Sequence, residues 1–488
     1  MTLRTRRPAI LSQVDQRRIL EAAVRVVKRV PLRCQGTPEF LDHLTAAGYQ
    51  VDGELITFPG HLVDELVDRM AAHKAAANAH PPAELPSRLE YSTSGQGLYC
   101  CDLETDLLRL ATVQDLADLS RVVEAIPGLG RAHPTFIPQD VPKANGDLHA
   151  FATIILNSSR PYRVSVYSPQ QVERFFEVEV IARGGDREAV RRRPTFACKL
   201  WFNSPFMITR DNVEVAMKAR ALFGQPLEIS IMPVAGSSTP VTMAGCLVHQ
   251  TAESMVCNLL TLAVDNRLSG YRCGALATDM RSGVFTQSGP DVDLLQLASA
   301  EMSEYCFGGQ VTVSRGPTTT AKVPGAQSMM EKSLATLLAV LSGTRSFGSL
   351  AVLAVADVGS LVQLMLDIEL MEYLQRLLDG LAVDEERLAE EVIATVSPTG
   401  ARFMEHEHTL RHFRAELFSP QLADRRVAGA WIGDPLEMVE RARSRARELV
   451  RTAPNRCPLS EADRRAIAQI VAEADREALL ERTSVAGG

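Results

Sequence analysis

A glycine and three hydroxyl residues follow a strand-like run near the middle of the chain. Gly236, Ser237, Ser238 and Thr239 join the apolar run LEISIMPV to the helical run VTMAGCLV. Hydroxyls and free backbone N–H groups at the start of a helix favour anions or the polar edge of a ligand. The same residues also suit an ordinary helix start, with Thr239 as N-cap and Pro240 in the first turn. The pattern leaves both interpretations open.

An acid and a guanidinium follow the next strand-like run, RCGALA. Asp279 and Arg281 stand in the sequence TDMRSG. In parallel α/β proteins the carboxyl ends of the strands meet at the edge where ligands bind. At that edge the pair could orient a carboxylate or an ammonium group. An ion pair that closes a loop is the alternative interpretation.

Two carboxylates interrupt the apolar helical run MLDIELMEYL. Asp367 and Glu369 are two residues apart, so on a helix they point to different faces. Spacing alone therefore does not make them a general acid–base dyad. It is compatible with one carboxylate facing a polar pocket while the other is solvated.

Three histidines lie close together in the run FMEHEHTLRHFRAELF. His406 and His408 would share one face of a strand, whereas His408 and His412 would share one face of a helix. Such a set could ligate zinc. The histidines could equally bind nearby carboxylates such as Glu405 or Glu416. Because the run has neither a cysteine pair nor HExxH, we expect no metal.

The length, composition and net charge of the chain are those of a soluble globular protein. It has 488 residues, of which 46% are hydrophobic and 23% charged, with a net charge of −7. This balance argues weakly against a nucleic-acid partner. Nine scattered cysteines without a disulfide framework suggest a reducing compartment, so we expect a cytoplasmic protein. No run of ~18 uncharged apolar residues occurs, and we expect no membrane span.

The order of elements indicates an α/β fold. Strand-like and helical runs alternate from about residue 147, and eight strand-like runs can be counted, the last over 401–408. This count predicts a (β/α)₈ TIM-type barrel, with a doubly wound open sheet as the alternative. We expect residues 1–146 to form an N-terminal helical cap with a small β segment. Residues 147–432 would form the barrel, and 433–488 a C-terminal helical tail.

Four segments in a fixed order resemble the trimethylamine methyltransferase family, the corrinoid-dependent amine methyltransferases. They are PVAGSSTPVTMAG, GALATDMRSG, QLMLDIE and HEHTLRHFR, and the resemblance extends over nearly the whole chain. It implies a TIM-type barrel that moves a methyl group from a methylated amine to Co(I) of a corrinoid (cobalamin) on a separate small protein. No tightly bound cofactor is expected in this chain, and a homo-oligomer is compatible with the family.

The chain contains only standard residues, so it resembles the non-pyrrolysine branch, which includes glycine betaine methyltransferases. That branch uses quaternary ammonium substrates. A permanent cation can be held by carboxylates or by an aromatic cage. Thr319 and Gly325 stand where acidic residues are common in the family, which leaves the substrate open.

The resemblance and the pattern together yield a set of candidate residues, with no catalytic residue assigned. The expected substrate-binding residues are Asp367, Glu369, Asp279, Arg281, His406, His408, Phe202 and Phe206, with Tyr91 and Trp201 as further cage candidates. Gly236, Ser237, Ser238 and Thr239 are expected to face the corrinoid. Two alternative functions remain: a non-catalytic barrel that binds a betaine or a corrinoid protein, and a metal-dependent barrel hydrolase.

Overall fold

The first part of the molecule is a layer of helices with a small sheet. The structure is a computed structural model that describes residues 8–80, 84–272, 274–313 and 316–486. The elements of the first part are α1 (Gln13–Val27), β1 (Leu32–Cys34), α2 (Pro38–Ala46), β2 (Gln50–Asp52), β3 (Leu55–Thr57) and α3 (Gly60–Asn78). The hydroxyl of Ser12 accepts a hydrogen bond from the backbone N–H of Asp15 and so caps α1.

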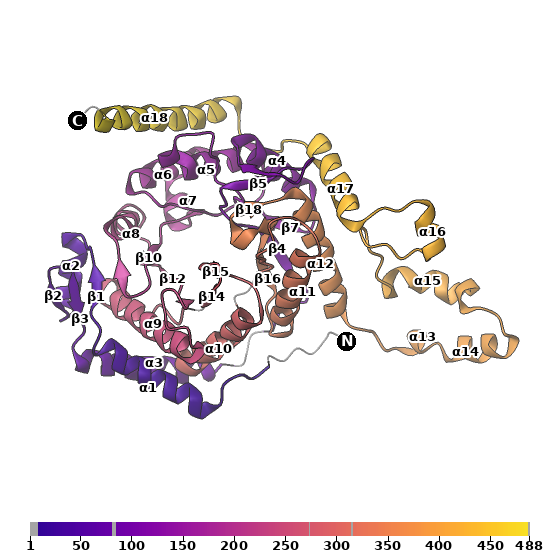
Figure 1. Cartoon of the computed structure of the whole chain (residues 1–488), viewed down its shortest axis with the longest axis horizontal. Helices are drawn as coiled ribbons and strands as arrows, with labels where there is room; N and C mark the ends of the chain where they lie inside the picture. Colours follow the sequence, from indigo (N-terminus) through magenta and orange to yellow (C-terminus); the bar gives the residue numbers. More distant parts are fainter. Residues whose placement is uncertain (1–7, 81–83, 273, 314–315, 487–488) are drawn as a thin grey trace.

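A series of short strands and longer helices follows. The strands are β4 (Glu90–Thr93), β7 (Leu129–Arg131), β8 (Val164–Ser165), β9 (Phe196–Ala197), β10 (Leu200–Phe202), β12 (Ile229–Ile231), β13 (Val234–Ala235), β14 (Leu276–Asp279) and β16 (Ser346–Leu350). The helices are α4 (Val113–Ala125), α5 (Gly146–Asn157), α6 (Val172–Ala182), α7 (Arg187–Arg192), α8 (Arg210–Phe223), α9 (Met243–Asp265), α10 (Pro290–Phe307), α11 (Ala326–Leu341) and α12 (Leu361–Asp379). Figure 1 shows the helices as an outer ring with strands inside it.

The strands of this series pair in parallel. β8 pairs with β9, β10 with β12, and β13 with β14. β4 pairs with β7 and also with β16, so the last strand of the series lies beside the first. In the described part of the chain these pairs form separate sheets rather than one continuous cylinder. The fold is therefore mixed α/β, with parallel strand pairs arranged in chain order.

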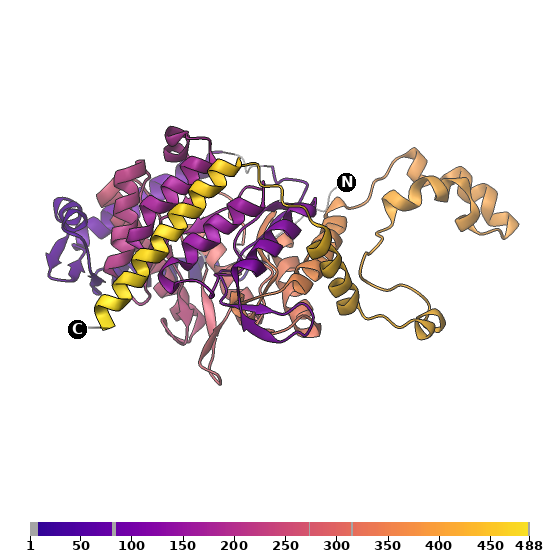
Figure 2. The same ribbon diagram turned by 90° about the horizontal axis from the view of Figure 1, so that it is seen from above.

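Short strands extend these sheets and form hairpins. They are β5 (Tyr99–Cys101), β6 (Leu108–Leu110), β11 (Met207–Ile208), β15 (Val284–Thr286), β17 (Val352–Leu353) and β18 (Val358–Gly359). β11 pairs in parallel with β1 and so holds the N-terminal layer to the ring. β14 and β15 form an antiparallel hairpin that projects from one side of the molecule, drawn in pink in Figure 2.

A segment that we call the arm, residues 381–436, leaves the ring after α12. It contains the short helices α13 (Glu385–Leu388), α14 (Glu390–Val396), α15 (Glu407–Glu416) and α16 (Ala428–Gly433). Figures 1 and 2 show it standing away from the ring. The chain then returns through α17 (Met438–Thr452) and α18 (Glu461–Ala486), which pack on α12 and α4 and on α5 and α6 respectively.

The prediction of a strand over 401–408 is wrong. Residues Phe403–Glu405 form a single 3₁₀ turn and α15 begins at Glu407. Charged residues give this run a two-residue alternation, but it lies in the arm, where no neighbouring strand is recorded among the described residues. Strands β4 and β7, which the sequence analysis assigned to the N-terminal cap, lie beside β16 of the ring.

Two large clusters of buried apolar side chains hold the ring together. One combines α4, α5, α6 and α12 with α17 and α18, and the other combines α1, α2 and α3 with α8, α9 and α10. The N-terminal layer and the C-terminal helices therefore share the core of the ring. Among the described residues, no helix combines the length and apolar character needed to cross a bilayer.

Candidate functional site

A cavity of about 370 Å³ lies among the strands of the ring. Its described lining residues are Trp201, Ile231, Met232, Gly274, Leu276, Gln287, Gln296, Gly316, Thr318, Ser346, Gly348 and Ser349. They come from β10, β12, β14, α10 and β16, and from the segments after β12, before β14, after β15 and between α10 and α11. The volume suits a small ligand rather than a nucleotide or a cofactor ring.

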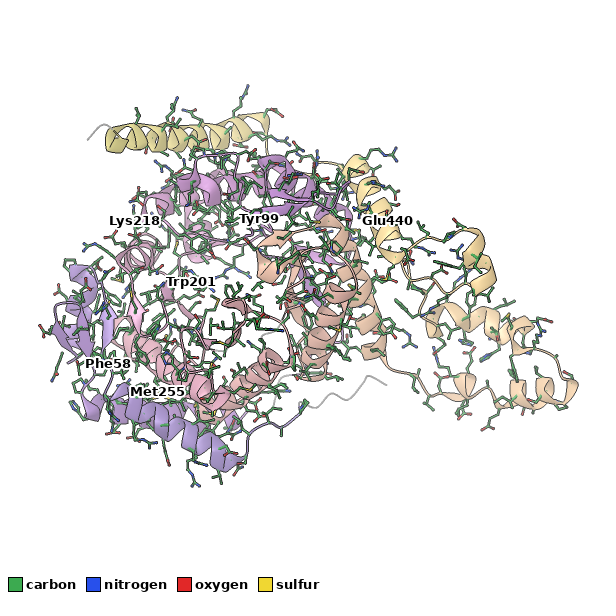
Figure 3. The ribbon with its side chains drawn as sticks, viewed as in Figure 1. Phe58, Tyr99, Trp201, Lys218, Met255 and Glu440 are labelled. Atoms are coloured by element: carbon green, nitrogen blue, oxygen red, sulfur yellow. The ribbon has the colours of Figure 1, made fainter. Side chains whose placement is uncertain are left out.

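Trp201 lines this cavity because β10 alternates its side chains. Leu200 and Phe202 are buried in the second large core cluster, so Trp201 between them faces the other side of the strand. Figure 3 labels Trp201 inside the ring. Phe202 and Phe206 pack edge to face in the core, with ring centroids 6.4 Å apart, and do not line the cavity.

Two polar atoms at the cavity have no hydrogen-bond partner among the described residues. They are Nε1 of Trp201 and Oε1 of Gln296. The amide nitrogen of Gln296 donates to the carbonyl of Ala275 at 2.7 Å, which fixes the orientation of the side chain. Buried polar groups are normally paired, so these two atoms of lining residues are exceptions among the described residues.

The described lining has no ionisable side chain. It offers an indole, two amides, three hydroxyls and apolar surface. Such groups can hold and orient a small molecule, and the face of an indole can attract a cation. They do not include a general acid, a general base or a metal ligand set. The described lining therefore offers groups that can bind and align a ligand.

The end of β16, which forms one wall of the cavity, has an unusual backbone. Ser349 and Ala351 have φ values of 65° and 72°, in the left-handed region that favours glycine. Asp367 holds this turn, because its Oδ2 accepts a hydrogen bond from the backbone N–H of Ala351 at 2.8 Å. Asp367 does not line the cavity; it positions the strand that does.

Asp367 forms a buried ion pair with Lys332 of α11. The Nζ–Oδ2 distance is 2.7 Å, and neither side chain is exposed. Gln363 donates to Oδ1 at 2.8 Å. Burial raises the pKa of Asp367 and lowers the pKa of Lys332, while the attraction between them opposes both shifts. The sequence analysis missed Lys332, although it stands on the buried stripe of α11 with Ser328 and Thr336.

Glu369 points to another region, as its spacing from Asp367 requires. Its carboxylate accepts hydrogen bonds from the backbone N–H groups of Gln421, Leu422 and Ala423, at 3.0, 3.2 and 3.3 Å. These residues belong to the returning end of the arm. Glu369 thus anchors the arm to α12 rather than facing the central cavity.

The turn from Gly236 to Thr239 lies beside the β14–β15 hairpin. The hydroxyl of Ser238 accepts from the backbone N–H of Val234 at 3.0 Å, which closes the turn. A Cβ on Gly236 would come within 3.0 Å of the sulfur of Met280, so the two loops touch. Thr239 is not the N-cap of the following helix: α9 begins at Met243, after Thr242.

Asp279 and Arg281 lie at the hairpin itself. The Arg281 side chain is 95% exposed, and its Nε lies 3.6 Å from Oδ1 of Asp279. The backbone N–H of Arg281 donates to the same oxygen at 2.9 Å and lowers the pKa of Asp279. We name the surface formed by Met232, Val241, Met280 and Val284 the rim; these four side chains are exposed and neighbour the turn and hairpin.

The histidines lie in the arm and bind Glu386. Nε2 of His408 lies 3.1 Å from the backbone oxygen of Glu386, and Nε2 of His412 lies 3.1 Å from its carboxylate. Nδ1 of His406 accepts from the backbone N–H of His408 and caps α15. No cluster of three or more His, Cys, Asp or Glu suited to a metal occurs among the residues that the structure describes.

Of the residues singled out in the sequence, the cavity therefore contains only Trp201. Tyr91 lies at a different groove, at the base of the arm. The remaining candidates fall at the rim, in the core, in the buried ion pair and in the arm. Gln296, Thr318, Ser346 and Ser349 had no local signal that marked them.

The fold is that of an α/β protein with a cavity inside a ring of parallel strand pairs. Comparison with known proteins identifies the family. A model of the trimethylamine methyltransferase (MTTB) family matches residues 2–478, so the chain belongs to this family and is a methyltransferase.

Three relatives of known name are similar in sequence to this chain over most of their length. The chain is 27% identical over 354 residues to trimethylamine methyltransferase MttB of Methanosarcina thermophila, covering 71% of this chain and 72% of the relative. It is 24% identical over 401 residues to the MttB of Desulfitobacterium hafniense strain DSM 10664 / DCB-2, covering 81% and 79%. It is 26% identical over 345 residues to the glycine betaine methyltransferase of D. hafniense strain Y51, covering 70% and 71%.

Proposed function

We propose that this methyltransferase moves a methyl group from a quaternary ammonium compound, such as a betaine, to the cobalt of a corrinoid carried by a separate small protein. The observation that supports this most directly is the central cavity. It offers the indole of Trp201 to a cation and has no acid or base among its described lining residues. A reaction that needs no proton transfer suits such a site.

The chemistry of a quaternary ammonium group meets that condition. Cobalt(I) of the corrinoid supplies the nucleophile. The bond from methyl carbon to nitrogen breaks as the bond to cobalt forms, and the electron pair stays on nitrogen, so the amine leaves neutral. The residues of this chain need only hold the cation, exclude water and align the methyl group. A neutral tertiary amine would first have to gain a proton so that it too could leave as a neutral amine, and the described lining of the cavity offers no acid to supply it.

We further propose that the strands close as a (β/α)₈ barrel. The pairing of β16 with β4 supports closure, because it brings the last strand of the series beside the first. The carboxyl ends of the strands would then carry the turn Gly236–Thr239 and the β14–β15 hairpin. The exposed apolar side chains of the rim support docking of the corrinoid protein over this mouth. The corrinoid is the partner's cargo, and the turn would face it.

The experiment that tests the proposal uses the two tryptophans of the chain, Trp201 and Trp431. In the Trp431→Phe variant, fluorescence reports only on Trp201. Glycine betaine, carnitine or proline betaine should quench it, and dimethylglycine should bind more weakly. Methyl transfer to a reduced corrinoid protein should follow the same order.

The matched control is Trp201→Phe, in which only Trp431 reports and no quenching should occur. Replacing Trp201 with leucine should weaken binding about 2- to 30-fold, from the ~0.5–2 kcal/mol of a cation–π contact. Dimethylglycine binding as tightly as glycine betaine would refute a quaternary substrate. Tight binding without any methyl transfer would instead assign the chain a binding role.

A further inference from the structure

The arm exposes more large apolar side chains for its length than the rest of the molecule. Of the 37 exposed large hydrophobic side chains among the described residues, 13 lie in the 56 residues of the arm. They are Leu381, Val383, Leu388, Ile393, Phe403, Met404, Leu410, Phe413, Leu417, Val427, Trp431, Ile432 and Leu436. Exposed large apolar side chains gathered in one segment are a mark of an interaction site.

The arm does not bury these side chains in a core of its own. Only Val396 and Leu422 are buried within it. Its longest helix, α15, has 10 residues, too few to be stable in water without packing. Internal contacts are mainly polar, such as the ion pair of Arg387 with Glu416 at 2.8 Å. The described contacts within the arm therefore leave most of its large apolar side chains uncovered.

The neighbouring surface of the ring is also apolar. Met330 and Leu334 are exposed on α11, and Tyr373 and Leu377 are exposed on α12. Each pair is four residues apart, so it forms a stripe on one helix face. Because α11 packs on α12, the two stripes lie on adjacent helices. We call these four side chains the stripe.

A groove of about 1160 Å³ lies at the base of the arm, between the arm and α12. Its lining includes Arg88, Arg376, Arg414 and Arg425, against the acids Glu372 and Asp379. The tip of the arm has the opposite balance: residues 384–391 read DEERLAEE, with five acids and one arginine. Groove and tip are complementary in charge.

We propose that the protein is a two-fold dimer in which the arm of each chain lies along the stripe and in the groove of a second copy. One chain contains both complementary surfaces, which is the requirement for a closed, two-fold interface. The arm and stripe supply 17 large exposed apolar side chains (13 and 4), comparable with the ~20–30 residues a side of a stable interface.

This partner is distinct from the corrinoid protein. Figure 2 shows the arm projecting sideways, while the β14–β15 hairpin at the rim points in another direction. The rim therefore stays free in the dimer. A carrier protein that must leave after each methyl transfer also cannot give the arm permanent cover.

The test measures the oligomeric state of the full chain by sedimentation velocity. Wild type should be a dimer. The double variant Leu410→Glu/Leu417→Glu, at positions 63% and 67% exposed in the single chain, should be monomeric, with the dimer weakened on the order of 100-fold or more. Leu55→Glu, at an exposed position of β3 on the opposite side of the ring, should remain dimeric.

Charge reversal tests the pairing of tip and groove. Glu390→Arg/Glu391→Arg and Arg88→Glu/Arg414→Glu should each weaken the dimer, because like charges then meet. An equimolar mixture of the two variants should restore it, because in the mixed dimer every tip meets a groove of opposite charge. A monomeric wild type, a dimer insensitive to the leucine substitutions, or a mixture that fails to associate would each overturn the proposal.

Discussion

Replacing Lys332 with methionine should destabilise the protein strongly, because it leaves Asp367 buried without its cation. Both side chains are fully buried and 2.7 Å apart. Removing one partner of a buried ion pair costs ~3–5 kcal/mol. Asp367 keeps the hydrogen bonds from Ala351 and Gln363, so we expect the lower end, about 3 kcal/mol, at pH 7.

The pH dependence of this loss of stability follows from the direction in which the pKa of Asp367 is shifted. Burial raises the pKa of Asp367 in the folded chain above its unfolded value. Without Lys332, the folded chain takes up a proton there more readily than the unfolded chain as the pH falls. The Lys332→Met variant should therefore regain stability relative to wild type as the pH falls below 7.

Urea unfolding followed by circular dichroism at 222 nm measures both effects, with Lys332→Met/Asp367→Asn as the matched control. The double variant removes the buried charge and should be more stable at pH 7 than Lys332→Met alone. A loss below about 1 kcal/mol for Lys332→Met, or a double variant no more stable than the single, would refute the argument from a buried charge.

Two further predictions concern a half-buried histidine and a crowded glycine. Burial lowers the pKa of His133 to about 4, and its Nδ1 accepts from the backbone N–H of Arg163 at 2.7 Å. As the pH falls, the unfolded chain protonates this histidine before the folded chain does. The free energy of unfolding of wild type should therefore fall by up to ~3 kcal/mol relative to that of His133→Gln between about pH 6.5 and pH 4. Parallel pH profiles of the two proteins in urea unfolding would contradict this. A Cβ on Gly359 would lie 2.2 Å from Cε1 of buried Phe136. Gly359→Ala should therefore lower the free energy of unfolding by ~2 kcal/mol or more. Gly429→Ala, with no atom within 4 Å, should be neutral, and equal melting temperatures for the two variants would disprove the clash.

The sequence by itself determined the family and the alternation of helices with short strands. Residues 1–146, expected to be mainly helical with a small β segment, contain α1, α2, α3 and α4 and the short strands β1, β2 and β3. These features depend on interactions between residues three or four positions apart, which a sequence displays directly. Four motifs in a fixed order were enough to identify the trimethylamine methyltransferase family, which the match over residues 2–478 confirms.

The strands were less predictable, because a strand is defined by its neighbour. Residues 401–408 have a two-residue alternation but lie in the arm, and so form a turn and a helix. Conversely, β4 and β7 become part of the ring because β16, more than 200 residues later in the chain, lies beside β4.

Only the tertiary structure decided what the candidate residues do. Asp367 stands in a family motif, yet its role depends on Lys332, 35 residues earlier, and on the backbone of Ala351. The cavity draws Trp201, Gln296 and Ser349 from three separate elements, so no local spacing could reveal it. Burial, pairing and unmatched hydrogen-bonding groups are properties of residues brought together across the chain, and those contacts exist only once it has folded.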